Sequence, residues 1–254
     1  MMLADEIREK RQERDILLMT HIVVGYPSFD DSLRVVEQMV AAGVDLMELQ
    51  IPFSEPIADG PVILRANQQA LMAGSTVERC LVFAEEVNRR FDIPFLLMTY
   101  YNILFKYGVS DFTGRMAAAG IAGSIVPDLP PEEAKDYLEA MGRNALEPIF
   151  IFSPNTRDER MRVIAKHAGG FVYCVARKGV TGAETSFSDE FAAYLARCRA
   201  ATDLPLALGF GVKRRSDVDF LRGQVDIAVI GTETLRVLDE HGVDGVRGFI
   251  EGLR

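Results

Sequence analysis

The stretch "DLMELQIPFSEPIADGP" (residues 45–61) carries the clearest structural signal of the chain. Its first part is almost continuously apolar, which is typical of a parallel strand that is buried on both faces. Because alternate residues of a strand face opposite sides, Met47 and Leu49 point one way, and Glu48 and Gln50 point the other. The apolar set suits contact with a layer of helices, so we expect Glu48 and Gln50 to face the inside of the sheet.

Similar apolar runs recur along the whole chain, and longer segments of helical character lie between them. The predicted strands cover residues 17–24, 45–51, 94–100, 123–127, 147–153, 171–176, 204–210 and 226–231. The predicted helices include residues 30–43, 61–74, 76–91, 130–142, 189–202 and 217–223, and another covers residues 3–15 before the first strand. Strands and helices therefore alternate from one end of the sequence to the other.

This alternation predicts an α/β fold, a (β/α)8 TIM barrel with an extra N-terminal helix and an extra helix between strands 2 and 3. A doubly wound open sheet is the alternative, but near-equal repeats over 254 residues favour the barrel. No linker rich in Gly, Pro or Ser divides the chain, so we expect residues 1–254 to form a single domain.

The composition narrows the class of protein. The net charge is −9, which argues against a nucleic-acid partner and against an anionic membrane surface. The three cysteines form no CxxC pair, and no histidine lies at metal-ligand spacing from them, so we expect reduced thiols, no metal site and a cytoplasmic location. The charged start "MMLADEIREKRQERD" is unlike a signal peptide, and no apolar stretch is long enough to span a membrane.

Two carboxylates stand out as candidate catalytic groups. Glu48 faces the predicted barrel interior, where an unpaired carboxylate is costly unless it has a function. A structural ion pair is the alternative, but no Lys or Arg occupies an inward position of another predicted strand, so we interpret Glu48 as a general acid/base. Asp59 lies in the loop after the same strand, where such barrels build their active sites, although Asp59-Gly60-Pro61 is also an ordinary turn signal.

Small residues follow the last three predicted strands, in "GVTG" (179–182), "GFG" (209–211) and "GT" (231–232). Such residues let backbone N–H groups approach an anion closely, and the loops after strands 7 and 8 of these barrels frequently hold a phosphate. We therefore expect a small-molecule phosphate ester as substrate. His167 and His241 fall in helix-rich, exposed stretches, and we interpret His21, in the first strand, mainly as a packing residue.

At this point the motifs resemble a known family. "MELQIPFSEPIADGPVI" (47–63) is similar to the signature "LELGIPFSDPLADGPxI" of tryptophan synthase α subunits. The segments "YYNILFKYG", "PDLPPEE", "PIFIFSPNT", "VYCVARKGVTGAE" and "LGFGV" also resemble blocks of that family, in the same order and over nearly the whole chain.

The resemblance implies a lyase that cleaves indole-3-glycerol phosphate to indole and glyceraldehyde 3-phosphate in tryptophan biosynthesis. It implies that Glu48 is the acid/base and that Asp59 stabilises charge at the indole nitrogen. The substrate-binding positions that it implies are Tyr173, Thr181, Gly182, Gly209, Phe210, Gly211, Gly231 and Thr232. It implies no cofactor in this chain, and a β subunit that carries pyridoxal phosphate and forms an α2β2 heterotetramer with it.

The sequence departs from the family pattern at three positions: Gln50 replaces a glycine, Glu55 an aspartate and Thr232 a serine. Gln50 should project into the barrel close to the site, and Glu55 falls in the loop that contacts the β subunit in the family. Three alternative functions remain: a stand-alone lyase that releases indole, a non-catalytic activator of a β subunit, and a different phosphate-binding barrel isomerase. The Glu48–Asp59 signature in its full context argues against the isomerase. The presence of both Glu48 and Asp59 argues against the activator.

Overall fold

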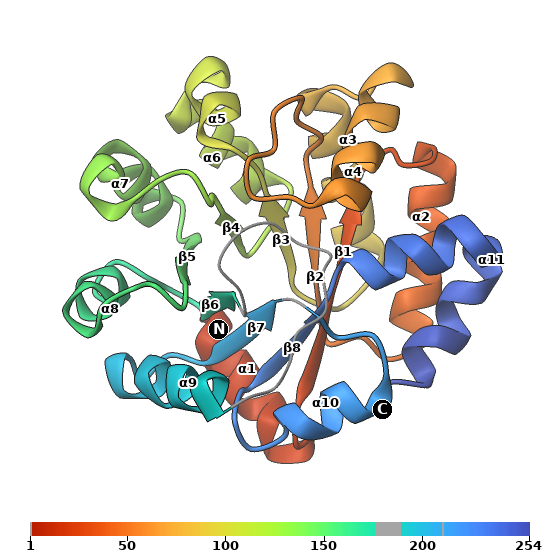
Figure 1. The fold of residues 1–254 in the computed structure, drawn as a ribbon. Coiled ribbons are helices and arrows are strands. Elements are labelled where there is room, and N and C mark those ends of the chain that lie inside the picture. Colours follow the sequence, from red (N-terminus) through yellow and green to blue (C-terminus); the bar gives the residue numbers. More distant parts are fainter. Residues whose placement is uncertain (1, 176–188, 210) are drawn as a thin grey trace.

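The computed structural model describes residues 2–175, 189–209 and 211–254. Within these residues the strands form a closed parallel barrel in the order β1 to β8, with the helices around it (Figure 1). The strands are β1 (Leu17–Val23), β2 (Leu46–Gln50), β3 (Phe95–Met98), β4 (Gly123–Ile125), β5 (Glu147–Phe152), β6 (Val172–Val175), β7 (Leu206–Gly209) and β8 (Ile227–Ile230). Each predicted strand is present, and the closed strand order excludes the open-sheet alternative.

The helices confirm both predicted additions to the barrel. They are α1 (Leu3–Glu13), α2 (Phe29–Ala41), α3 (Pro61–Met72), α4 (Val77–Arg90), α5 (Tyr101–Tyr107), α6 (Val109–Ala118), α7 (Lys135–Arg143), α8 (Asp158–Ala165), α9 (Asp189–Ala201), α10 (Arg215–Leu221) and α11 (Thr232–Glu251). The extra N-terminal helix is α1, and the pair α3 and α4 fills the longer connection between β2 and β3. No helix in the described ranges is long and apolar enough to cross a membrane.

Two connections differ from the sequence prediction. The segment predicted as one helix over residues 130–142 begins with a 3-10 turn, Pro131–Glu133, before α7 starts at Lys135. Between β3 and β4 the chain forms two helices, α5 and α6, and Gly108 separates them with a φ of 97°. Glycine tolerates this φ, so the chain can change direction there.

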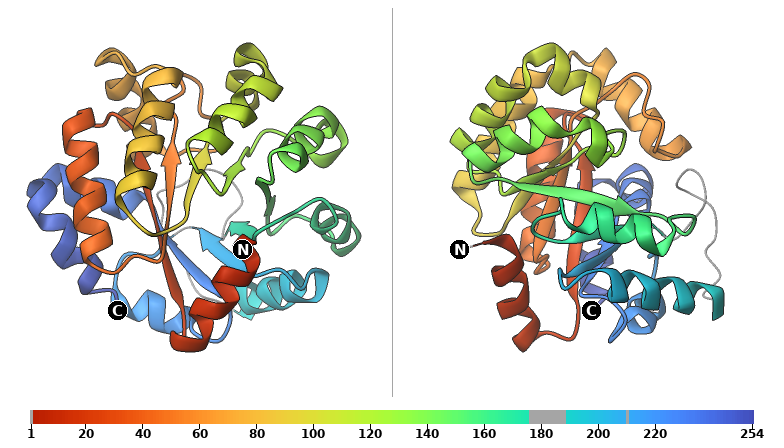
Figure 2. Two further views of the ribbon diagram at one scale, coloured as in Figure 1. Left: turned by 180° about the vertical axis from the view of Figure 1, so that it is seen from behind. Right: turned by 90° about the vertical axis from the view of Figure 1, so that its left-hand side faces the viewer.

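Two apolar clusters hold the barrel together. One lies between the strands and the surrounding helices, and it contains Met47 and Leu49 of β2. The other fills the barrel interior, and at one end it includes Leu3 and Ile7 of α1. The turned views show α1 lying across that end of the barrel (Figure 2). The N-terminal end is therefore covered, and a ligand must enter from the C-terminal end.

The pairing register of the strands determines which polar side chains lie side by side in the barrel interior. In the parallel pairing of β1 with β2, His21 lies directly beside Glu48. Side chains at paired positions of neighbouring strands point to the same face of a sheet, so both enter the barrel. The predicted inward direction of Glu48 therefore agrees with the register, and His21 shares it.

Candidate active site

A pocket opens at the C-terminal end of the barrel. Side chains and loops from around the whole barrel line it. They include His21, Glu48, Asp59, Met98, Ile125, Ile151, Tyr173, Val175, Gly211, Lys213, Val229, Gly231, Thr232, Glu233 and Arg236.

Glu48 does not stand alone in the barrel. Its Oε1 lies 2.5 Å from Nδ1 of His21, and both side chains are almost completely buried. The expectation of a carboxylate without a basic partner was therefore wrong, and so was the interpretation of His21 as mainly a packing residue. The partner was missed because it is a histidine inside an apolar run on a neighbouring strand.

The pair is electrostatically coupled. Burial lowers the pKa of His21, but the hydrogen bond and the negative charge of Glu48, with a further contribution from Asp59, raise it above the ordinary value of 6.5 overall. Nε2 of His21 and Oε2 of Glu48 have no hydrogen-bond partner in the described part of the chain. Because buried polar atoms are normally paired, such atoms beside a pocket can receive a partner from a ligand or a water.

Two buried side chains hydrogen-bond to the carboxylate of Asp59. Gln50 donates from Nε2 to Oδ2 of Asp59 at 2.6 Å, and the Tyr100 hydroxyl donates to the same oxygen at 3.3 Å. Burial raises the pKa of Asp59, while the hydrogen bonds from Gln50 and Tyr100 and the nearby His21 oppose this shift. Gln50 and Asp59 therefore meet, as the inward direction of Gln50 suggested, and Tyr100 is a contact that the sequence pattern did not reveal.

Tyr173 on β6 forms one wall of the pocket. Burial raises its pKa well above 10, and the negative charges of Glu48 and Asp59 add to that shift, so the phenol is neutral at ordinary pH. Gly209 at the end of β7 provides the room for this ring, because a Cβ there would lie 2.2 Å from Cε1 of Tyr173. The structure thus gives Gly209 a steric role beside Tyr173.

The opposite side of the pocket can receive an anion. Gly211 follows β7 with a φ of 84°, and Gly231 and Thr232 form the start of α11. The first N–H groups of a helix lack intrahelical partners and carry a partial positive charge, which favours phosphate binding. The predicted positions Thr181, Gly182 and Phe210 lie outside the described residues.

Charged side chains surround this anion-binding end. Lys213 lines it, and Arg236 lies one turn into α11. Glu233 also lines the pocket, and its Oε2 pairs with Nη1 of Arg236 at 2.9 Å. The carboxylate is thereby neutralised next to the start of the helix. Neither cation was predicted, because both lie just beyond the glycine motifs that drew attention to these loops.

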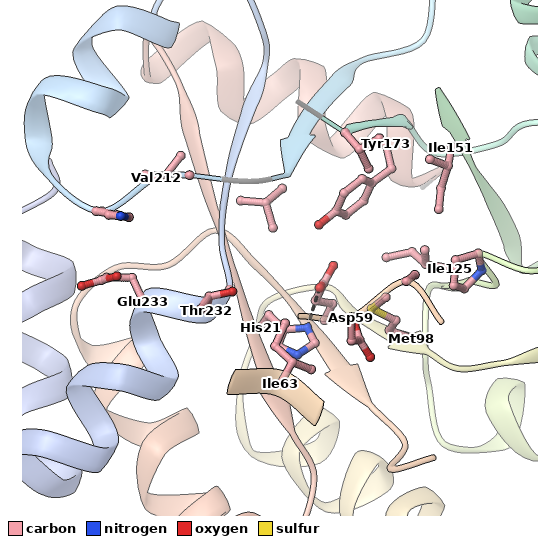
Figure 3. A pocket seen from close by; sticks show the side chains of 18 of the residues that line it. His21, Asp59, Ile63, Met98, Ile125, Ile151, Tyr173, Val212, Thr232 and Glu233 are labelled. Atoms are coloured by element: carbon pink, nitrogen blue, oxygen red, sulfur yellow. Dashed lines mark hydrogen bonds and ion pairs between the residues drawn. The ribbon is translucent and has the colours of Figure 1, made fainter. Parts of the chain in front are cut away.

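The two ends of the pocket differ in character. Figure 3 shows Val212, Thr232 and Glu233 on one side, and Met98, Ile125 and Ile151 on the other, near Asp59 and Tyr173. The first end suits an anionic group and the second a flat apolar ring. The fold and this pocket define a (β/α)8-barrel protein whose pocket holds two buried carboxylates between an apolar end and an end that suits an anion.

Comparison with known proteins identifies the family. The family model for the tryptophan synthase alpha chain matches residues 7–248. The alpha chain of Syntrophotalea carbinolica is 63% identical over the full length of both chains, and that of Desulforapulum autotrophicum is 63% identical over 99% of this chain and all of its own. Among solved structures, a Mycobacterium tuberculosis tryptophan synthase chain is 31% identical, with a TM-score of 0.93 over 99% of this chain and 96% of its own. The chain belongs to the tryptophan synthase alpha chain family.

Membership in this family establishes the activity. The chain is a lyase of tryptophan biosynthesis that cleaves indole-3-glycerol phosphate to indole, and the alpha chain itself uses no cofactor for this reaction. The apolar and anion-binding ends of the pocket match the two parts of this substrate.

Proposed function

We propose that Glu48 is the general acid/base of the cleavage. The reaction breaks the bond between C3 of the indole and the first carbon of the glycerol chain. A protonated Glu48 gives its proton to C3, and the resulting carboxylate takes the proton of the hydroxyl on the first chain carbon. The electron pair of the broken bond returns to the ring, which leaves indole, an aldehyde and the original protonation state of Glu48. The unpartnered Oε2 in the pocket supports this role.

Asp59 stabilises the other end of the ring in this proposal. When C3 gains a proton, positive charge develops at the ring nitrogen, and a fixed carboxylate lowers the energy of that state. Among the described residues, the two side-chain hydrogen bonds to the Asp59 carboxylate both end on Oδ2, so Oδ1 can accept from the indole N–H. Tyr173, kept neutral by its surroundings, supplies an amphipathic wall for the ring.

The phosphate is held at the start of α11 and by the loop after β7. Gly211, Gly231 and Thr232 supply backbone N–H groups, and Lys213 adds positive charge, whereas the charge of Arg236 is balanced by Glu233. Thr181, Gly182, Gly209 and Phe210 belong to the same proposal by their match to the family motifs. A substrate fixed by its phosphate would present its ring to Glu48 and Asp59.

We also propose that the chain binds a β subunit in an α2β2 assembly and works in the cytoplasm. One similar solved structure is a tryptophan synthase complex from Pyrococcus furiosus, with a TM-score of 0.85 and 29% identity. Ile57, in the loop after β2, exposes 72% of its surface, and Phe105, on α5 after β3, exposes 71%. Exposed large apolar side chains of this kind support a protein partner at that end of the barrel. The three cysteines are free and buried, which suits a reducing compartment.

Indole release from indole-3-glycerol phosphate tests the assignment of Glu48. Glu48→Gln keeps the shape and removes the proton transfer, so we expect a loss of at least about 10²-fold in kcat with little change in KM. Glu55→Gln is the matched control, because Glu55 is an exposed glutamate in the adjoining loop. Near-normal turnover by Glu48→Gln would exclude this residue as the acid/base.

A further inference from the structure

His21 lies between the two ends of the pocket. On one side its partner in the strand register is Glu48 of β2. On the other side is Gly231, which follows β8, and a Cβ at Gly231 would lie 3.7 Å from the Cβ of His21. Figure 3 shows the His21 ring between Thr232 and Asp59. A substrate that extends from the anion-binding end to the two carboxylates therefore runs past this ring.

The two ring nitrogens of His21 have different surroundings. Nδ1 lies 2.5 Å from Oε1 of Glu48, whereas Nε2 is buried and has no hydrogen-bond partner among the described residues. The side chain lines the pocket, although only 1% of the residue's surface is exposed. If His21 only held Glu48 in place, the second nitrogen would serve no purpose, and an unpaired buried nitrogen is destabilising. Nε2 is therefore available to a polar group of the substrate.

We propose that His21 is a catalytic residue that carries the proton of the substrate hydroxyl to Glu48. The proposal deepens the assignment of Glu48 as the acid/base and rests on it. The hydroxyl concerned is the one on the first chain carbon, because the glycerol chain joins the ring to the phosphate and His21 lies on the side of Glu48 that faces the anion-binding end. A neutral imidazole suits this task, since one nitrogen can accept a proton while the other gives one up.

The proton transfers balance within the pair. Glu48, protonated on Oε2, gives this proton to C3 of the indole. As the carbon–carbon bond breaks, its electron pair returns to the ring and the hydroxyl oxygen forms the aldehyde double bond. The hydroxyl proton moves to Nε2 of His21, and Nδ1 passes its own proton to Oε1 of Glu48. Glu48 is then protonated again and His21 is neutral, and exchange with water in the emptied pocket returns the protons to Oε2 and Nδ1.

The test is rescue of a His21 variant by free imidazole, measured as indole release by the full chain. His21→Ala removes both nitrogens and leaves room for a small ring, so we expect kcat to fall by at least about 10-fold with little change in KM. Imidazole should restore at least about 5-fold of this loss, whereas 1-methylimidazole, which has no N–H to pass on, should restore less than about 2-fold. Thr20→Val is the matched control, because it changes the neighbouring buried position of β1, which faces the opposite side of the strand. It should retain the kcat of the unaltered chain.

His21→Phe provides a second test if His21→Ala folds poorly. It keeps a flat buried ring and removes both nitrogens, so we expect a similar loss of kcat in a chain whose circular dichroism is unchanged. Wild-type kcat in either folded variant would overturn the inference, and so would equal activity of His21→Ala in the presence of the two imidazoles. Glu48→Gln separates this failure from that of the proposed function. Near-normal turnover of Glu48→Gln would overturn the acid/base assignment itself, whereas its inactivity beside fully active His21 variants would overturn only the proton transfer through His21.

Discussion

Nδ1 of His21 and Oε1 of Glu48 lie 2.5 Å apart in the barrel interior, from paired positions of adjacent strands. A hydrogen bond this short, between two buried side chains that are shielded from water, fixes the orientation of the carboxylate. It also leaves Oε2 of Glu48 without a hydrogen-bond partner among the described residues, so this oxygen is available for proton transfer. The relationship suggests that His21 matters to catalysis through Glu48.

Substitution of His21 tests this relationship. His21→Leu keeps similar bulk and removes the donor, so we expect kcat to fall by about 10-fold or more while KM changes little. His21→Asn places an amide nitrogen near the position of Nδ1, and we expect it to retain more activity than His21→Leu. The measurement is steady-state indole release by both variants. Equal activity of the two variants would show that the hydrogen bond to Glu48 is not what matters.

Asp59→Asn should stabilise the fold while it impairs catalysis. The pKa of Asp59 is raised from 3.8, so the folded chain binds this proton more tightly than the unfolded chain does. The contribution of Asp59 to stability therefore falls as the pH rises from about 3.8 through the raised value. We expect the variant to melt higher at pH 7, by on the order of 2 °C for each 1 kcal/mol gained, with a smaller difference at acidic pH. Thermal unfolding at several pH values measures this, and a difference that grows towards low pH would contradict it.

Gly209→Ala should disturb the wall formed by Tyr173. The added Cβ would meet the ring 2.2 Å away, so the ring must move into the pocket or the strand must shift. We expect KM for the substrate to rise by at least about 5-fold and stability to fall by about 1–3 kcal/mol, as for other overpacked sites. Gly248→Ala is the matched control, because nothing lies within 4 Å of a Cβ at that position on α11. Unchanged kinetics in Gly209→Ala would argue against a role of the Tyr173 ring.

Thr232→Asp tests the anion-binding end. A carboxylate in the first turn suits the dipole of α11, so the helix should remain folded, but its charge repels phosphate. We expect the affinity for glycerol phosphate to fall by at least about 10-fold, whereas Thr232→Ser should stay within about 3-fold. Isothermal titration calorimetry compares the two variants. Similar affinities would place the phosphate elsewhere.

The barrel could be predicted from the sequence because the residue patterns that indicate strands and helices are local. Strand alternation put Glu48 and Gln50 inside, and the glycines after the last strands indicated loops that the structure does place beside the pocket at Gly211 and Gly231. The prediction of one domain over residues 1–254 stays a prediction. The same holds for the substrate contacts of Thr181, Gly182 and Phe210.

The contacts that connect the site could not be predicted in this way. The pairing of His21 with Glu48 depends on the register between two strands, which alternation along one strand does not determine. The hydrogen bond from Gln50 to Asp59 depends on the path of the loop between them. Tyr100, which follows β3, donates to the same carboxylate from another part of the chain. Such contacts follow from the tertiary structure and not from residue type.

The separation of the pocket into an anionic-ligand end and an apolar end has a consequence for the order in which products depart. Once the carbon–carbon bond is broken, indole is neutral and no longer tethered to the phosphate, which we propose is held near Thr232 and Lys213. The phosphorylated aldehyde keeps every contact that the phosphate made. Raised ionic strength should therefore speed escape of the aldehyde and leave that of indole nearly unchanged. Inhibition by added glyceraldehyde 3-phosphate should likewise weaken in salt, while inhibition by added indole should not.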